Sequence, residues 1–141
     1  MKKLLHWSTW LGIITSWCII VVVVFWEIFP YNIIMFTAPT FPVMNKTVKQ
    51  GEMVKFVSNY CKFTDISADV SRIFKNEILF YTPPTVGNIK KGCSNVTVAV
   101  TVPSELPSGS YVIENVYQYR VNPIRTVIVR HDTDEFRVVE K

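Results

Sequence analysis

Histidine is scarce in this sequence, and the residues used in catalysis do not gather in recognisable patterns. The chain has 141 residues but only 2 histidines, His6 and His131. It contains no Gly-x-Ser-x-Gly motif, no cysteine with a histidine at ligand spacing, and no glycine-rich phosphate loop. A catalytic site needs a nucleophile, a base and a group that orients them. The sequence therefore predicts no enzyme, no cofactor and no small-molecule substrate. An envelope enzyme using His131 is the least favoured alternative.

Clustered charge is also lacking. Asp132, Asp134 and Glu135 could offer oxygen atoms to calcium, but they lack the glycine and the spacing of a calcium-binding loop. A polar turn between strands is the favoured interpretation. Lys90 and Lys91 are the only adjacent basic pair beyond residue 30, whereas a nucleic-acid surface needs a stripe of basic residues. We expect neither a metal site nor a nucleic-acid partner.

A long apolar run is present at the N-terminal end. The segment from Leu4 to Trp26 holds no formally charged residue. About 20 apolar residues in a helix are enough to cross the hydrocarbon core of a bilayer. Amphipathic aromatic rings are typical of both membrane edges, and here they are Trp7, Trp10, Trp26 and Tyr31. The sequence predicts that residues 1–29 form a short cytoplasmic tip and a transmembrane helix in contact with lipid.

A cleaved signal peptide is the alternative to a retained anchor. Signal peptides have an apolar region of roughly 7–15 residues, followed by small residues at the cleavage site. This run is longer, and the bulky segment 28–36 follows it. Lys2 and Lys3 precede the run, and the positive-inside rule keeps such residues in the cytoplasm. We expect a single-pass protein of the bacterial inner membrane whose C-terminal domain is periplasmic.

The segment that follows the apolar run is rich in proline and aromatic residues. Residues 30–42 contain Pro30, Pro39 and Pro42 but neither glycine nor serine, so a flexible linker is not expected. We interpret this segment as an extended juxtamembrane stem. The folded domain is then expected to occupy residues 43–141.

Strand signals recur at short intervals beyond the stem. In the clearest, Asn95 to Val102, valines alternate with threonine or alanine, as in a strand with one buried face. Pro123 fits a turn that folds the run from Ser110 back as a hairpin. About seven short strands in this length predict an antiparallel β-sandwich, immunoglobulin-like or fibronectin-like. The expected strands are 53–61, 70–74, 78–81, 95–102, 110–122, 126–130 and 136–139.

Three cysteines are present, and two of them lie in the expected domain. Cys18 falls inside the apolar run, where it acts as a small apolar residue. Cys61 and Cys93 form an even pair, which in an oxidising compartment predicts one disulfide. Two buried free thiols are the alternative.

The segment Leu106-Pro-Ser-Gly-Ser-Tyr111 carries a resemblance. The pattern of Leu106, Gly109 and Tyr111 resembles the tyrosine corner of immunoglobulin-like sandwiches, which implies a hydrogen bond from Tyr111 back to the backbone. A wider set is similar to small single-span inner-membrane proteins of tailed phages and their hosts, which carry an immunoglobulin-like periplasmic domain. It covers most of residues 45–140: Gly51, Cys61, Arg72, Gly92-Cys93, Leu106–Tyr111, Tyr119–Arg125 and Phe136.

Tyrosines and arginines of the expected hairpin have two interpretations. Tyr117 and Tyr119 share a strand face with Tyr111, which favours the core, although tyrosine is also frequent in interfaces. Arg120, Arg125 and Arg130 could form a partner surface or simply protect a sheet edge. We expect a membrane-anchored, non-enzymatic interaction module that binds an envelope or phage protein, in exclusion of a second infection or in lysis. A structural subunit of a virion or envelope complex is the alternative.

Overall fold

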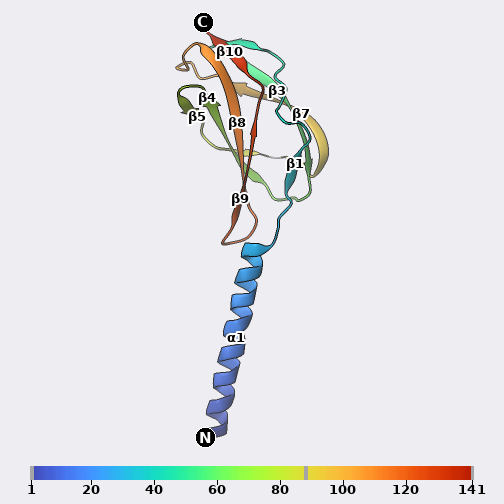
Figure 1. The fold of residues 1–141 in the computed structure, drawn as a ribbon, viewed down its shortest axis with the longest axis vertical. Coiled ribbons are helices and arrows are strands. Elements are labelled where there is room, and N and C mark those ends of the chain that lie inside the picture. Colours follow the sequence, from blue (N-terminus) through green and yellow to red (C-terminus); the bar gives the residue numbers. More distant parts are fainter. Residues whose placement is uncertain (1, 88, 141) are drawn as a thin grey trace.

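A long N-terminal helix, α1 (Lys2–Ile28), stands apart from a β domain that contains the rest of the chain (Figure 1). The computed structural model describes residues 2–87 and 89–140, with side chains from Trp10 onward. The segment Trp10–Ile28 is long and apolar enough to cross a membrane, and none of it is buried against the domain. Pro30 follows the helix and lacks the N–H that a further turn would need.

The domain is a β-sandwich of two sheets. The smaller sheet has the order β1-β3-β7, with β1 (Ile34–Phe36), β3 (Met53–Lys62) and β7 (Gly92–Thr101). The larger sheet has the order β2-β10-β8-β4-β5, and β6 pairs with β4 and β9 with β8. Its strands are β2 (Thr47–Lys49), β4 (Ala68–Lys75), β5 (Leu79–Tyr81), β6 (Thr85–Gly87), β8 (Gly109–Arg120), β9 (Thr126–Asp132) and β10 (Phe136–Val139).

The predicted sandwich is confirmed, but its sheets are not purely antiparallel. Strand β10 pairs with β2 in parallel, with Val138 opposite Val48. The expected hairpin is present, since β8 and β9 pair from Glu114–Asp132 to Arg120–Thr126. Three strands of three residues each, β1, β2 and β6, were not expected, because such short segments carry no readable alternation.

The expected stem is not a separate segment. Strand β1 lies within it and pairs antiparallel with the end of β3, from Ile34–Lys62 to Phe36–Tyr60. Ile33 and Phe41 are 2% and 0% exposed and belong to the two hydrophobic clusters of the sandwich. The predicted domain boundary at residue 43 is therefore wrong. The proline-rich segment covers one end of the core because its aromatic side chains gain more by burial than by remaining at a membrane surface.

The core follows strand alternation. In β8, the inward face carries Tyr111, Ile113, Tyr117 and Tyr119, all buried. Phe41 stacks on Phe56 with the ring centroids 5.6 Å apart, which joins the proline-rich segment to the smaller sheet. These contacts fix the two sheets relative to each other.

Candidate binding site

The disulfide and the tyrosine corner are both present. Cys61 and Cys93 are paired in register on β3 and β7 and form a disulfide. The hydroxyl of Tyr111 donates a hydrogen bond to the carbonyl of Pro107 at 2.9 Å. Leu106 is buried under this corner, and Gly109 begins strand β8. Both features stabilise the sandwich, and neither presents chemistry to a ligand.

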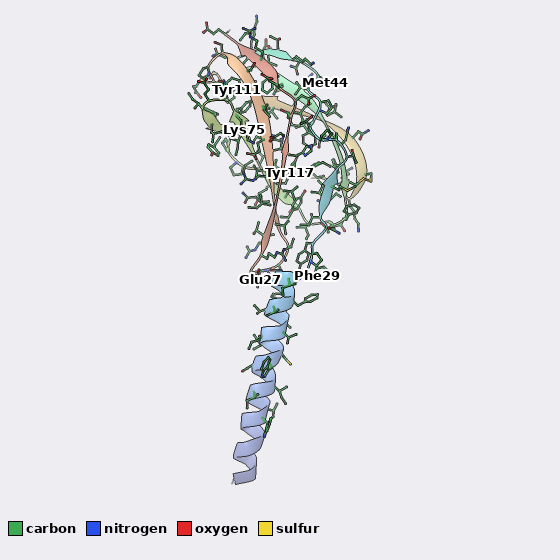
Figure 2. The ribbon with its side chains drawn as sticks, viewed as in Figure 1. Glu27, Phe29, Met44, Lys75, Tyr111 and Tyr117 are labelled. Atoms are coloured by element: carbon green, nitrogen blue, oxygen red, sulfur yellow. A yellow bond between two sulfur atoms is a disulfide. The ribbon has the colours of Figure 1, made fainter. Side chains whose placement is uncertain are left out.

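Tyr117 and Tyr119 do not form a surface. They are 4% and 0% exposed, and both belong to a hydrophobic cluster between the sheets, as the core interpretation expects. Figure 2 shows Tyr117 in the middle of the domain. Burial raises the pKa of Tyr117 to about 12. Because Tyr119 faces the same interior, the alternation of β8 places both rings between the sheets.

The three arginines of the expected surface have different environments. Arg125 reaches the end of α1, where its guanidinium donates hydrogen bonds to the carbonyls of Glu27 and Phe29. Arg130 pairs with Glu114 at 3.5 Å on the outer face of the larger sheet. Arg120 is exposed, and its guanidinium donates a hydrogen bond to the carbonyl of Pro123 at 3.4 Å. The arginines therefore do not form one continuous patch.

The turn of the β8–β9 hairpin lies against the C-terminal end of α1 (Figures 1 and 2). The amide of Asn122 donates hydrogen bonds to the Trp26 carbonyl and the Tyr31 hydroxyl, both at 3.3 Å. Its amide oxygen accepts the N–H of Arg125 at 2.8 Å, which closes the turn. The last carbonyls of a helix have no partner within it and favour positive charge. Asn122 and Arg125 satisfy these carbonyls and hold the domain on the helix.

The aromatic residues expected at the membrane edges lie at different positions along α1 and just beyond its end. Trp10 is exposed on α1, and the backbone of Trp26 accepts the bond from Asn122. Tyr31 lies just beyond the helix, with the Arg125 guanidinium 5.5 Å from its ring centre. The side chain of Trp7 lies outside the described ones.

A charged cluster crosses the outer face of the larger sheet. Glu114 is nearly buried and pairs with Lys75 at 3.2 Å, and Lys75 also contacts Asp132 at 3.3 Å. Arg130 completes the cluster. Because these charges neutralise one another, the cluster is more suited to fixing strand register than to binding a charged ligand.

His131 is not part of a polar turn. It belongs to β9, and its ring stacks on Phe36 and packs against Phe41, with centroids 4.4 and 4.3 Å away. Burial lowers the pKa of His131 from its ordinary value. His131 is half-buried and packs against two phenylalanine rings.

A pocket of about 150 Å³ opens between the two sheets along one side of the sandwich. Its polar lining residues are Arg72 on β4, Tyr117 on β8, and Ser58 and Tyr60 on β3. The remaining lining residues are apolar or lack a side chain: Val70, Gly87, Ile89, Val96 and Val98. Strand β6 can lie this close to β4 only because Gly87 has no side chain, since a Cβ there would be 2.6 Å from Val70.

Arg72 carries an unneutralised charge in this pocket. Its Nε is buried without a hydrogen-bond partner, and Nη1 reaches the Thr85 hydroxyl only at 3.4 Å. Among the residues whose side chains the structure describes, none forms an ion pair with Arg72. Burial lowers the pKa of the guanidinium. Arg72 is half-buried, and a cation at such a position that lacks an anionic partner can accept a carboxylate through charge-assisted hydrogen bonds.

The sequence pointed to the hairpin but not to this pocket. At the level of the sequence, Arg72 was only one of the residues that carry the resemblance to single-span inner-membrane proteins. A local signal did exist, because Arg72 lies between Val70 and Phe74 on the inward face of β4. A charged residue at an inward position of an otherwise apolar strand face marks a polar group that needs a partner.

Fold and sites together define a β-sandwich that is joined directly to one long apolar helix and that carries an inter-sheet pocket. A comparison with known protein families and a comparison with curated proteins found no match.

Proposed function

We propose that the chain is a membrane-anchored, non-enzymatic binding module. The helix holds the protein in a bilayer, and the sandwich presents a surface to another protein just outside it. A bacterial inner membrane with the N-terminus in the cytoplasm fits Lys2 and Lys3, which precede the apolar segment. The resemblance to single-span proteins of phages and their hosts supports the same location.

The contact between the hairpin and the helix carries this proposal. A domain that is only tethered to an anchor would leave the helix end to water. Here Arg125 and Asn122 donate to the carbonyls of Glu27, Phe29 and Trp26. Removal of the helix would leave Asn122 without the Trp26 carbonyl and Arg125 without the Glu27 carbonyl. The contact therefore favours a retained anchor over a cleaved signal peptide, and it fixes the direction in which the domain faces.

Intact mass and alkaline extraction test the anchor. We expect the full-length chain, made in a Gram-negative host, to keep residues 1–28 and to stay in the membrane pellet after an alkaline wash. A mature protein that begins beyond residue 28, or release into the supernatant, would contradict the proposal.

A spin-label distance tests the fixed orientation. Cys18 is free and lies on α1, so it can carry one label. Ile128 is exposed on β9, and a second label attached to Ile128→Cys reports the position of the domain. We expect a narrow distance distribution that broadens in Arg125→Gln combined with Asn122→Ala. Arg120→Gln is the matched control and should leave the distribution narrow, while an equally broad distribution in the unmodified protein would exclude a fixed domain.

A further inference from the structure

Strand β7 has a free edge. It pairs only with β3 among the described strands, from Met53–Thr101 to Lys62–Gly92. The N–H of Val57 and the carbonyl of Asn59 form hydrogen bonds on the side of β3 where β1 lies. The backbone N–H and C=O groups of the odd-numbered residues of β3 therefore point away from β7. Even-numbered residues therefore make the bonds between β3 and β7. It follows that the backbone groups of Asn95, Thr97 and Ala99 point outward from the sheet.

This edge lacks the usual protection against strand addition. Proteins blunt exposed edges with charges, prolines, bulges or very short strands. Strand β7 has 10 residues, and its sequence Gly-Cys-Ser-Asn-Val-Thr-Val-Ala-Val-Thr contains neither a charge nor a proline. By contrast, β5 and β6 have 3 residues each and are separated by Pro83 and Pro84. Only the β7 edge offers a long template of unpaired backbone groups in the described part of the smaller sheet.

The apolar side of the inter-sheet pocket, called the groove below, lies beside this edge. Val96 and Val98 point from β7 toward the larger sheet, yet Val96 remains 41% exposed. Ile89 faces them from the connection that follows β6. Arg72, whose Nε has no hydrogen-bond partner, lines the same pocket. A strand added to β7 would lie about 4.8 Å from it and would turn alternate side chains into the groove.

We propose that an extended segment of a partner protein adds to the β7 edge and places an aspartate or glutamate side chain on Arg72. The backbone ladder would supply affinity, as in other cases of strand addition. The inward apolar side chains would cover Val96 and Val98, and the carboxylate would neutralise Arg72 through charge-assisted hydrogen bonds. This inference rests on the proposed function and names the chemistry of its partner.

A second copy of the chain is the less suitable occupant. Strand β7 begins near the helix end of the domain and finishes near the C-terminal end (Figure 1). Two copies in one bilayer are related by a two-fold axis along the membrane normal, which sets their β7 strands parallel. The slanted bonds of a parallel ladder are not reciprocal between identical residues. A symmetric pair of β7 strands is therefore excluded in one membrane, whereas a separate segment can approach in the favoured antiparallel direction.

Peptide binding to the full-length chain in lipid nanodiscs tests the proposal. The probes are fluorescein-labelled ten-residue peptides of alternating valine and threonine with lysine at both ends. One probe has glutamate at a central inward position, and the matched probe has glutamine there. Fluorescence anisotropy should show at least tenfold tighter binding of the glutamate peptide. Arg72→Gln should abolish that preference, whereas Arg120→Gln, an exposed arginine on the outer face, should leave it unchanged.

A proline at the edge tests the ladder itself. Thr97→Pro removes an N–H that faces outward, which an edge strand tolerates, and should weaken binding of both peptides at least tenfold. If this variant does not fold, amide exchange in the unmodified protein replaces it, and the glutamate peptide should then protect the amides of Thr97 and Ala99.

Three results would overturn the proposal: equal affinity for the two peptides, a glutamate preference that survives Arg72→Gln, and a dimer of the chain that excludes the peptide. Alkaline extraction of vesicles that contain the same protein reports the anchor separately. Release of the chain with peptide binding intact would contradict the membrane anchor but not the strand addition. Failure of the proposed function and failure of this inference are therefore distinguishable.

Discussion

Strands β7 and β8 are both long, and their environments are opposite. Strand β8 has 12 residues and is bonded on both sides, by β4 on one and by β9 and β10 on the other. Most of its residues are buried on both faces. Strand β7 has 10 residues, is bonded on one side only among the described strands, and has one buried residue, Val100. One strand builds the domain, and the other is left accessible.

The alternation of side chains along a strand does not by itself decide which of them are buried. Both strands have regularly alternating side chains, and both were expected to bury one face. In β8, Glu114 and Val116 are buried on the outer face as well, because β4 and β9 flank them. In β7, Val96 stays exposed, since no strand of the described chain covers that side. The neighbours of a strand determine its burial, and at β7 a neighbour is missing.

Proline substitutions should break the comparison most strongly. Val116→Pro removes an N–H from the middle of the larger sheet, where β4 and β9 both pair with β8. We expect Val116→Pro to abolish the cooperative thermal transition seen by circular dichroism. Thr97→Pro, its counterpart on β7, should retain that transition. Equal loss of folding in both variants would show that the β7 edge is not free.

Loss of the disulfide should have the next largest effect. The bridge joins β7 to β3, the only strand that holds it among those described. Cys61→Ser with Cys93→Ser should lower the free energy of unfolding by about 4 kcal/mol, from the 32-residue separation. Urea unfolding measures this, and Cys18→Ser is the control that should leave the midpoint unchanged. An unchanged midpoint in the double variant would mean that β7 does not depend on the bridge.

The tyrosine corner gives a smaller effect on the β8 side. Tyr111→Phe removes only the hydroxyl that donates to Pro107 and should cost about 1 kcal/mol in chemical unfolding. Tyr81→Phe is the matched control, because Tyr81 is 63% exposed on β5. Similar unfolding midpoints for the two variants would show that the hydrogen bond of the tyrosine corner does not stabilise the domain.

Acidification should weaken the domain through His131, which pairs with β8 opposite Asn115. Burial lowers the pKa of His131 in the folded state, so the unfolded chain binds a proton more readily. This stabilisation is present above the unfolded pKa of about 6.5 and is lost as the pH falls below it. The urea midpoint should be lower at pH 5.5 than at pH 7.5. The difference should shrink in His131→Phe and persist in His6→Gln.

Much of the fold was predictable because its signals are local. The valine alternation located β7, Pro123 located the hairpin turn, and the spacing of Leu106, Gly109 and Tyr111 anticipated the observed bond to Pro107. The stem was misassigned because proline and aromatic residues suit an extended chain at a membrane and one packed on a sandwich equally well. Only the tertiary contacts of Phe41 with Phe56 and His131 distinguish these cases.

The candidate site was less predictable, because it depends on what strands lack as well as what they contain. Nothing in the local sequence states that β7 has one neighbour. Arg125 was expected to face a partner, yet it caps α1, because the hairpin turn meets the helix at a sequence distance of about a hundred residues. Arg72 meets the other lining residues only when β3, β4, β7 and β8 come together around one pocket.

The central claim is that the edge of β7 is free and receives a partner strand. Hydrogen exchange of the β7 amides, measured by NMR on the full-length chain in micelles, tests it most directly. The account predicts alternation: the amides of Asn95, Thr97 and Ala99 exchange rapidly, while those of Val96 and Val98 are protected by β3. Every central amide of β8 should be protected. Addition of the glutamate peptide should slow exchange at the three rapid positions. Uniform protection along β7 before the peptide is added, or rapid positions that the peptide leaves unchanged, would contradict a free edge that receives a partner strand.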